Sequence, residues 1–138
     1  MCIRDRDQYG LSVWEVADEQ VDPAVLRQRL DAIQEGRVDP APRLAPPERQ
    51  TLAPTVVVRP EASAQATVLE VRAADRSGVV YLVCAALARL DVAVRSAHVD
   101  TLGPQAVDVF YVQEASAGAL SDQRAAQAAH AVRDALTG

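Results

Sequence analysis

Four consecutive residues, Asp75-Arg76-Ser77-Gly78, form the part of this 138-residue chain whose residue types are best suited to bind a ligand. They separate a segment expected to be a strand from one expected to be a helix. Backbone N–H groups at a helix start lack intrahelical partners and attract a carboxylate or another anion, and a glycine lets a ligand approach closely because it has no Cβ. One interpretation is an anion-binding loop that continues into Val79. The alternative, which the residue types alone favour, is an ordinary strand-to-helix turn capped by Asp or Ser.

Ser96 and His98 form a second candidate site. The apolar residues around them alternate in two phases, and a regular strand would leave one pair in solvent. These pairs are Val92 with Val94 and Ala97 with Val99. A β-bulge near Arg95-Ser96 would reconcile the phases, and bulges often re-aim side chains beside binding sites. The alternative for His98 is an exposed strand histidine.

No arrangement of residues in the chain indicates catalysis. The chain has two histidines and two cysteines, and it shows no Cys–His pair, Ser–His–Asp triad or cluster of carboxylates. Cys2 and Cys84 predict neither a disulfide framework nor a metal site, and Cys84 is expected to pack in the core. We expect this chain to be catalytically inactive and to hold no metal or cofactor.

Composition excludes several function classes. The formal net charge is −5, with 14 basic and 19 acidic residues, and no basic run is longer than two. A nucleic-acid-binding protein would need a cationic stripe to neutralise phosphates. No apolar run approaches the roughly 20 residues of a membrane span, and no secretory leader is visible. These observations favour a soluble cytoplasmic protein without nucleic-acid or membrane partners.

Hydrophobic spacing predicts alternating strands and helices after a proline-rich stretch. The expected strands are 11–16, 55–59, 66–72, 92–102 and 105–113, and the expected helices begin at Asp22-Pro23, near Val79 and at Ser121 or Asp122. The apolar stripes of the last two helices are expected at Val80, Val83, Leu87 and Leu90, and at Ala125, Ala129, Val132 and Leu136. Asp108 interrupts an otherwise apolar strand, so we expect it on the solvated face or at a sheet edge.

The chain is expected to contain one complete unit preceded by part of another. Residues 10–37 repeat the final strand-and-helix pattern of the chain, with Trp14 at the position that Phe110 occupies in the later copy. Four segments follow from this repeat. They are a non-native-looking leader at 1–9, the end of an incomplete first unit at 10–37, a proline-rich linker at 38–54 and a complete domain at 55–138.

The stretch 66–114 resembles an ACT domain. The resemblance is carried by Asp75-Arg76-Ser77-Gly78, by Thr101-Leu102-Gly103 and by Val107-Asp108-Val109-Phe110-Tyr111-Val112. It implies an α+β, ferredoxin-like sandwich in which an antiparallel sheet carries helices on one face. It also implies an amino acid bound at Asp75, Arg76, Ser77, Gly78 and Val79, with Ser96 and His98 facing a ligand held by a partner unit. Ser77 departs from the pattern, because ACT domains commonly carry proline there.

Within this family, the chain is most similar to the C-terminal tandem ACT region of the bifunctional PII uridylyltransferase/uridylyl-removing enzymes. That resemblance implies glutamine as the ligand, a second ACT unit in cis or in trans as the partner, and the PII signalling protein as a partner only through the parent enzyme. Magnesium would belong to the parent's catalytic domains. Two alternatives remain open: a ligand-free ACT pairing module, and an ACT tail of another metabolic enzyme.

Overall fold

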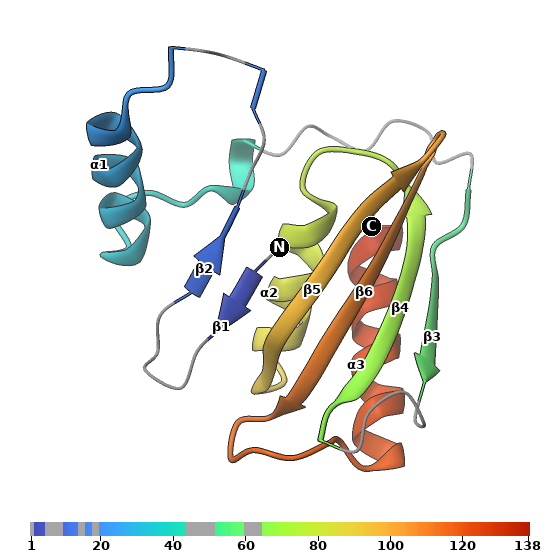
Figure 1. Ribbon diagram of the computed structural model, residues 1–138. Coiled ribbons are helices and arrows are strands. Elements are labelled where there is room, and N and C mark those ends of the chain that lie inside the picture. Colours follow the sequence, from blue (N-terminus) through green and yellow to red (C-terminus); the bar gives the residue numbers. More distant parts are fainter. Residues whose placement is uncertain (1, 5–9, 14–15, 18–19, 44–51, 60–64) are drawn as a thin grey trace. The chain divides into compact units, whose positions relative to one another are not determined.

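The computed structural model describes residues 2–4, 10–13, 16–17, 20–43, 52–59 and 65–138 (Figure 1). The chain divides into two compact units. The larger consists of Met1–Val13 and Pro47–Gly138, and the smaller of Trp14–Pro46. Both candidate ligand-binding segments belong to the larger unit.

A four-stranded antiparallel sheet forms the centre of the larger unit, with the strand order β3-β4-β6-β5. Figure 1 shows its two helices on one face of this sheet. The elements are β3 (Thr55–Arg59), β4 (Thr67–Ala74), α2 (Val79–Ala88), β5 (Val92–Leu102), β6 (Gln105–Glu114) and α3 (Asp122–Thr137). The predicted α+β sandwich is therefore confirmed. Strand β3 pairs with β4.

The core lies between the sheet and the two helices. Alternate residues of each strand face the helices, as the period of a β-strand requires. Leu87 of α2 and Phe110 of β6 are fully buried there. In α3 the buried alanine that follows Ala125 is Ala128 and not the predicted Ala129, which is partly exposed.

Strand β5 contains the predicted β-bulge. Val94 pairs with Val112 of β6, whereas Ser96 pairs with the next residue of β6, Tyr111, so that one residue of β5 is left over between the two pairs. The extra residue shifts the phase of the strand and turns Ala97 into the core, where it is 1% exposed.

The smaller unit contains α1 (Pro23–Gln34). The side chain of Asp22 caps this helix by accepting a hydrogen bond from the backbone N–H of Ala24 at 2.8 Å, and Pro23 occupies the first helical position as predicted. Gly36 follows the end of the helix with a positive φ of 70°. In the proline-rich stretch a short 3₁₀ helix, η1, covers Ala41–Arg43.

Two short strands near the start of the chain pair with each other. Strand β1 (Cys2–Arg4) lies antiparallel to β2 (Gly10–Ser12), so part of the predicted leader belongs to a small sheet. Among the described residues of the strand expected over 11–16, Leu11 and Ser12 belong to β2, while Val13 and Val16 are outside any strand. Trp14 lies outside the described residues.

Candidate functional site

The loop 75–78 connects β4 to the start of α2. Gly78 is the N-cap residue, with a positive φ of 87°, and no side chain caps the helix. The alternative of an Asp or Ser cap is therefore wrong, because neither Asp75 nor Ser77 takes that role. The first turn of α2 keeps backbone N–H groups without a side-chain acceptor, and these groups together with the helix dipole favour an anion.

Two hydrogen bonds fix the loop at the end of the sheet. The backbone N–H of Asp75 donates to the carbonyl oxygen of Pro104 at 2.9 Å, in the turn between β5 and β6. Arg76 donates from Nη2 to the carbonyl oxygen of Leu136 in α3 at 3.0 Å. Asp75 and Ser77 are exposed. The guanidinium of Arg76 thus forms a hydrogen bond within the fold, whereas the side chains of Asp75 and Ser77 face solvent.

Asp108 lies on the helix-covered face of the central strand β6, with 1% of its surface exposed. The expectation of a solvated or edge position is wrong because β6 is an inner strand of the sheet and position 108 shares the phase of Ala106, Phe110 and Val112. Neither carboxylate oxygen has a hydrogen-bond partner. The period-two pattern of these residues was the signal that could have revealed this position.

The surroundings of Asp108 favour its neutral form. Its pKa is raised from 3.8 to about 6, chiefly because burial penalises the charged carboxylate. The negative charges of Asp75 and Asp100 add to this effect, whereas the nearby backbone of Asp100 opposes it without reaching hydrogen-bonding geometry. Asp75 belongs to the loop 75–78, so Asp108 lies within the electrostatic field of that loop.

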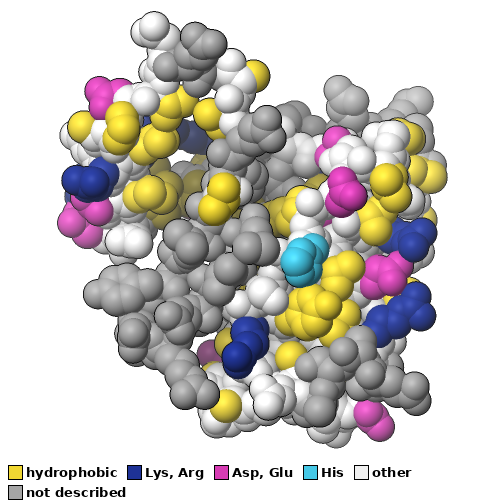
Figure 2. Space-filling view, in the orientation of Figure 1, with side chains coloured by type: hydrophobic (Ala, Val, Ile, Leu, Met, Phe, Trp, Pro, Cys, Tyr) yellow, Lys and Arg dark blue, Asp and Glu magenta, His cyan; other side chains and the backbone are white. Residues whose placement is uncertain are grey.

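Ser96 and His98 lie on the opposite face of the sheet from Asp108. They alternate with the buried Ala97 along β5, and the ring of His98 meets the ring of Tyr111 edge to face at 6.1 Å. Figure 2 shows this open face, with hydrophobic side chains over the middle of the sheet, a histidine beside them and charged side chains near one edge. Within this chain, the structure does not bring Ser96 and His98 to the loop 75–78.

Glu70 joins two arginines in β3 and β4. Its carboxylate is 3.2 Å from Nη2 of Arg59 and 2.8 Å from Nη2 of Arg72. The hydrogen bond from Arg72 lowers the pKa of Glu70 most, and the hydrogen bond from Arg59 lowers it further. The sequence analysis missed this cluster because Arg59 comes close to Glu70 only through the pairing of β3 with β4. Since its arginines already pair with a carboxylate, the cluster is a less suitable anion site than the start of α2.

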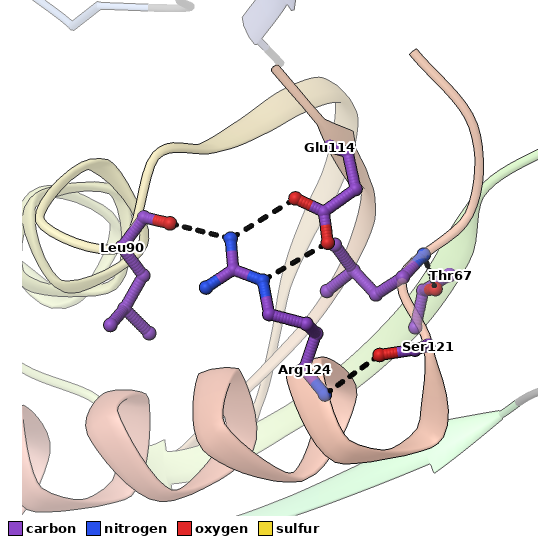
Figure 3. A network of polar contacts seen from close by, with 6 residues as sticks. Thr67, Leu90, Glu114, Ser121 and Arg124 are labelled. Carbon is purple, nitrogen blue, oxygen red and sulfur yellow. Dashed lines mark hydrogen bonds and ion pairs between the residues drawn. The ribbon is translucent and has the colours of Figure 1, made fainter. Parts of the chain in front are cut away.

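A further polar cluster lies at the opposite end of the sheet from the loop 75–78 (Figure 3). Arg124 of α3 donates to both carboxylate oxygens of Glu114 at 3.0 Å and to the carbonyl oxygen of Leu90 at 2.6 Å. Nearby, Thr67 Oγ1 accepts from the backbone N–H of Leu120 at 2.8 Å. These bonds join the end of β6, the segment after α2 and the start of α3. Their role is structural, because each acceptor and donor is satisfied within the fold.

Two kinds of feature are absent from the described ranges. No three His, Cys, Asp or Glu side chains are grouped there as a metal ion would require. None of the helices in these ranges is long and apolar enough to cross a bilayer.

Relatives named bifunctional uridylyltransferase/uridylyl-removing enzyme cover most of the chain. The enzyme of Streptomyces coelicolor is 40% identical over an alignment of 134 positions that covers 89% of this chain. Those of Caulobacter vibrioides and Nitrobacter hamburgensis are 40% and 34% identical over 53% and 80% of the chain. The chain spans only 16%, 8% and 12% of these three relatives.

No family model matches the chain. A crystal structure of an unknown protein from Galdieria sulphuraria covers 55% of this chain and 41% of its own, at 25% identity and a TM-score of 0.44.

Proposed function

We propose that this chain is a regulatory, amino-acid-sensing ACT module from the C-terminal region of a bifunctional uridylyltransferase/uridylyl-removing enzyme, and that glutamine is its ligand. The observation that carries the proposal is the uncapped start of α2 at Gly78, in a chain whose relatives bear that enzyme name. The α-carboxylate of glutamine would lie on the backbone N–H groups of the first turn.

Regulation follows if the ligand binds two arrangements of the parent enzyme with different affinities. Glutamine held between this unit and a second ACT unit, in cis or in trans, would favour one arrangement and so control nitrogen signalling. Ser96 and His98 lie on an exposed face away from the loop, and they would contact a ligand held by the partner unit. The PII protein and magnesium would interact with the parent's catalytic domains.

The test is a titration of L-glutamine against wild type and Gly78→Val by isothermal calorimetry. A β-branched side chain is strained at φ 87° and would crowd the start of α2. Gly118→Val is the matched control, because Gly118 has a φ of 100°, open space around its Cβ position and a place in the loop between β6 and α3.

The proposal expects wild type and Gly118→Val to bind glutamine and Gly78→Val to lose binding while circular dichroism shows a folded chain. Equal glutamine binding by all three proteins would eliminate the loop as the site. Absence of binding by wild type would favour the alternative of a ligand-free pairing module. That alternative has one observation behind it: the edge strand β5 exposes Val99 and Leu102.

A further inference from the structure

The carboxylate of Asp108 is a buried charged group that lacks a hydrogen-bond partner. Its position is set by the register of β6, where Asp108 pairs with Val71 of β4 and Val99 of β5. Two residues before Asp108 in β6, Ala106 pairs with Ala73 of β4. This pair lies near the end of the sheet at which the loop 75–78 begins. The unpartnered carboxylate is therefore on the face and toward the end of the sheet where α2 starts.

An unpartnered buried carboxylate is costly, since burial removes its water and nothing replaces the lost hydrogen bonds. The neighbouring charges of Asp75 and Asp100 are negative and increase the cost. Arg76, the cation of the loop, donates to Leu136. A bound group that carries positive charge and N–H donors would satisfy Asp108, whereas an anion would be repelled.

Two complementary features thus lie at this end of the larger unit. The uncapped start of α2 favours an anionic group, and the carboxylate of Asp108 favours a cationic one. A molecule that satisfies both carries a carboxylate and an ammonium group a few bonds apart, as an α-amino acid does. Val79, the first residue of α2, belongs to the same buried cluster as Val71 and Phe110, the neighbours of Asp108 in the sheet.

We propose that Asp108 binds the ammonium group of an α-amino acid whose carboxylate lies at the start of α2. This inference rests on the proposed function and names the side chain that selects amino acids over other carboxylic acids. Because Asp108 is covered, the ligand reaches it when the loop 75–78 moves away from the sheet. Such a movement breaks the Asp75–Pro104 and Arg76–Leu136 hydrogen bonds, and this links ligand entry to the position of α3.

The experiment compares two probes by calorimetry: L-glutamine and glutaramate, which has the same carboxylate and amide but no ammonium group. Wild type, Asp108→Asn and the control Asp31→Asn, an exposed aspartate of α1, are each titrated. Wild type and the control are expected to prefer glutamine by about tenfold or more, the range for one charge-assisted hydrogen bond. Asp108→Asn is expected to lose that preference while its affinity for glutaramate stays the same.

A second readout needs no variant. Binding of an ammonium group ionises Asp108, so glutamine should release a proton near pH 6 and none from this group near pH 8. Calorimetry in two buffers with different ionisation enthalpies measures that release.

The outcomes separate the two proposals. If wild type binds neither probe, the proposed function fails and this inference fails with it. If wild type binds glutamine but Asp108→Asn retains the preference, or if no proton is released near pH 6, only the assignment of Asp108 is overturned.

Discussion

Arg76 and Leu136 are 60 positions apart in the sequence, and the guanidinium Nη2 of the first donates to the carbonyl oxygen of the second at 3.0 Å. Leu136 is in the last turn of α3, where carbonyl groups lack intrahelical partners and the helix dipole is negative. The arginine satisfies one of these carbonyl groups and neutralises part of the dipole. The candidate loop is thereby attached to a second helix.

We expect Arg76→Ala to lower the free energy of unfolding by about 1 kcal/mol, as for one hydrogen bond to a charged group at a helix end. Glutamine binding should remain measurable, because the guanidinium contacts α3. Urea unfolding and calorimetry measure the two effects, and Arg27→Ala, at an exposed position of α1, is the control. Loss of glutamine binding with an unchanged unfolding midpoint would instead assign Arg76 to the ligand.

Features that depend on local chemistry could be predicted from the sequence. The N-caps Asp22 and Ser121 are recognisable because their side chains bond backbone N–H groups two or three residues away. The bulge between Val94 and Ser96 is recognisable because one extra residue in a strand reverses the phase of its apolar positions. The bounds of β5 agree with the prediction at both ends.

Features that depend on strand order and conformation could not be predicted in the same way. The alternation of β6 indicates which face Asp108 shares, but Asp108 is buried also because β6 has a neighbour on each side, and the local sequence does not contain the strand order. Asp75 and Ser77 could each have capped α2, and only the left-handed conformation of Gly78 shows that neither does.

Truncation of Leu87 tests the prediction that this residue belongs to the buried apolar stripe of α2. Leu87 is fully buried beneath the sheet in α2, so Leu87→Ala should lower the free energy of unfolding by about 2–5 kcal/mol through lost transfer energy and a residual cavity. Denaturation in urea measures this loss. Leu26→Ala in α1, where the side chain is 47% exposed, is the matched control and should change stability much less. Similar losses in both variants would contradict the assignment of the core.

The apolar stripe of α1 is exposed. Val25, Leu26 and Leu30 are 41%, 47% and 58% exposed, and the one buried residue of α1 is Ala32. A helix of 12 residues without a packed apolar face is marginal in water. We therefore expect an isolated peptide of residues 1–54 to show little protection of the α1 amides in hydrogen exchange. Strong protection in that peptide would show that residues 10–37 hold their structure without docking.

The buried carboxylate of Asp108 predicts how stability depends on pH. Its pKa in the folded chain is about 6, above the ordinary value of 3.8. The folded chain therefore retains a proton that the unfolded chain releases between these two values. The stability from this group is fully present below about pH 4 and is lost as the pH rises through about 6. The difference between the two pKa values corresponds to about 3 kcal/mol.

Glu70 and Glu114 act in a separate pH range. Hydrogen bonds from Arg72 and Arg59 lower the pKa of Glu70, and those from Arg124 lower the pKa of Glu114. Their stabilising contributions are present above their ordinary pKa of 4.5 and are lost as the pH falls through the lowered values. The range from about pH 5 to 7 therefore lies above the range in which these two glutamates affect stability.

Asp108→Asn removes the titrating group and keeps nearly the same shape. The variant should be more stable than wild type near pH 8, where the wild-type carboxylate is charged and buried, and the difference should shrink toward pH 5. Urea unfolding of both proteins at several pH values measures this difference, and subtracting the two curves cancels the contributions that the two proteins share. Parallel curves for the two proteins from pH 5 to 8 would show that Asp108 does not titrate in this range. Asp31→Asn, which removes an exposed carboxylate, should leave the wild-type slope in place.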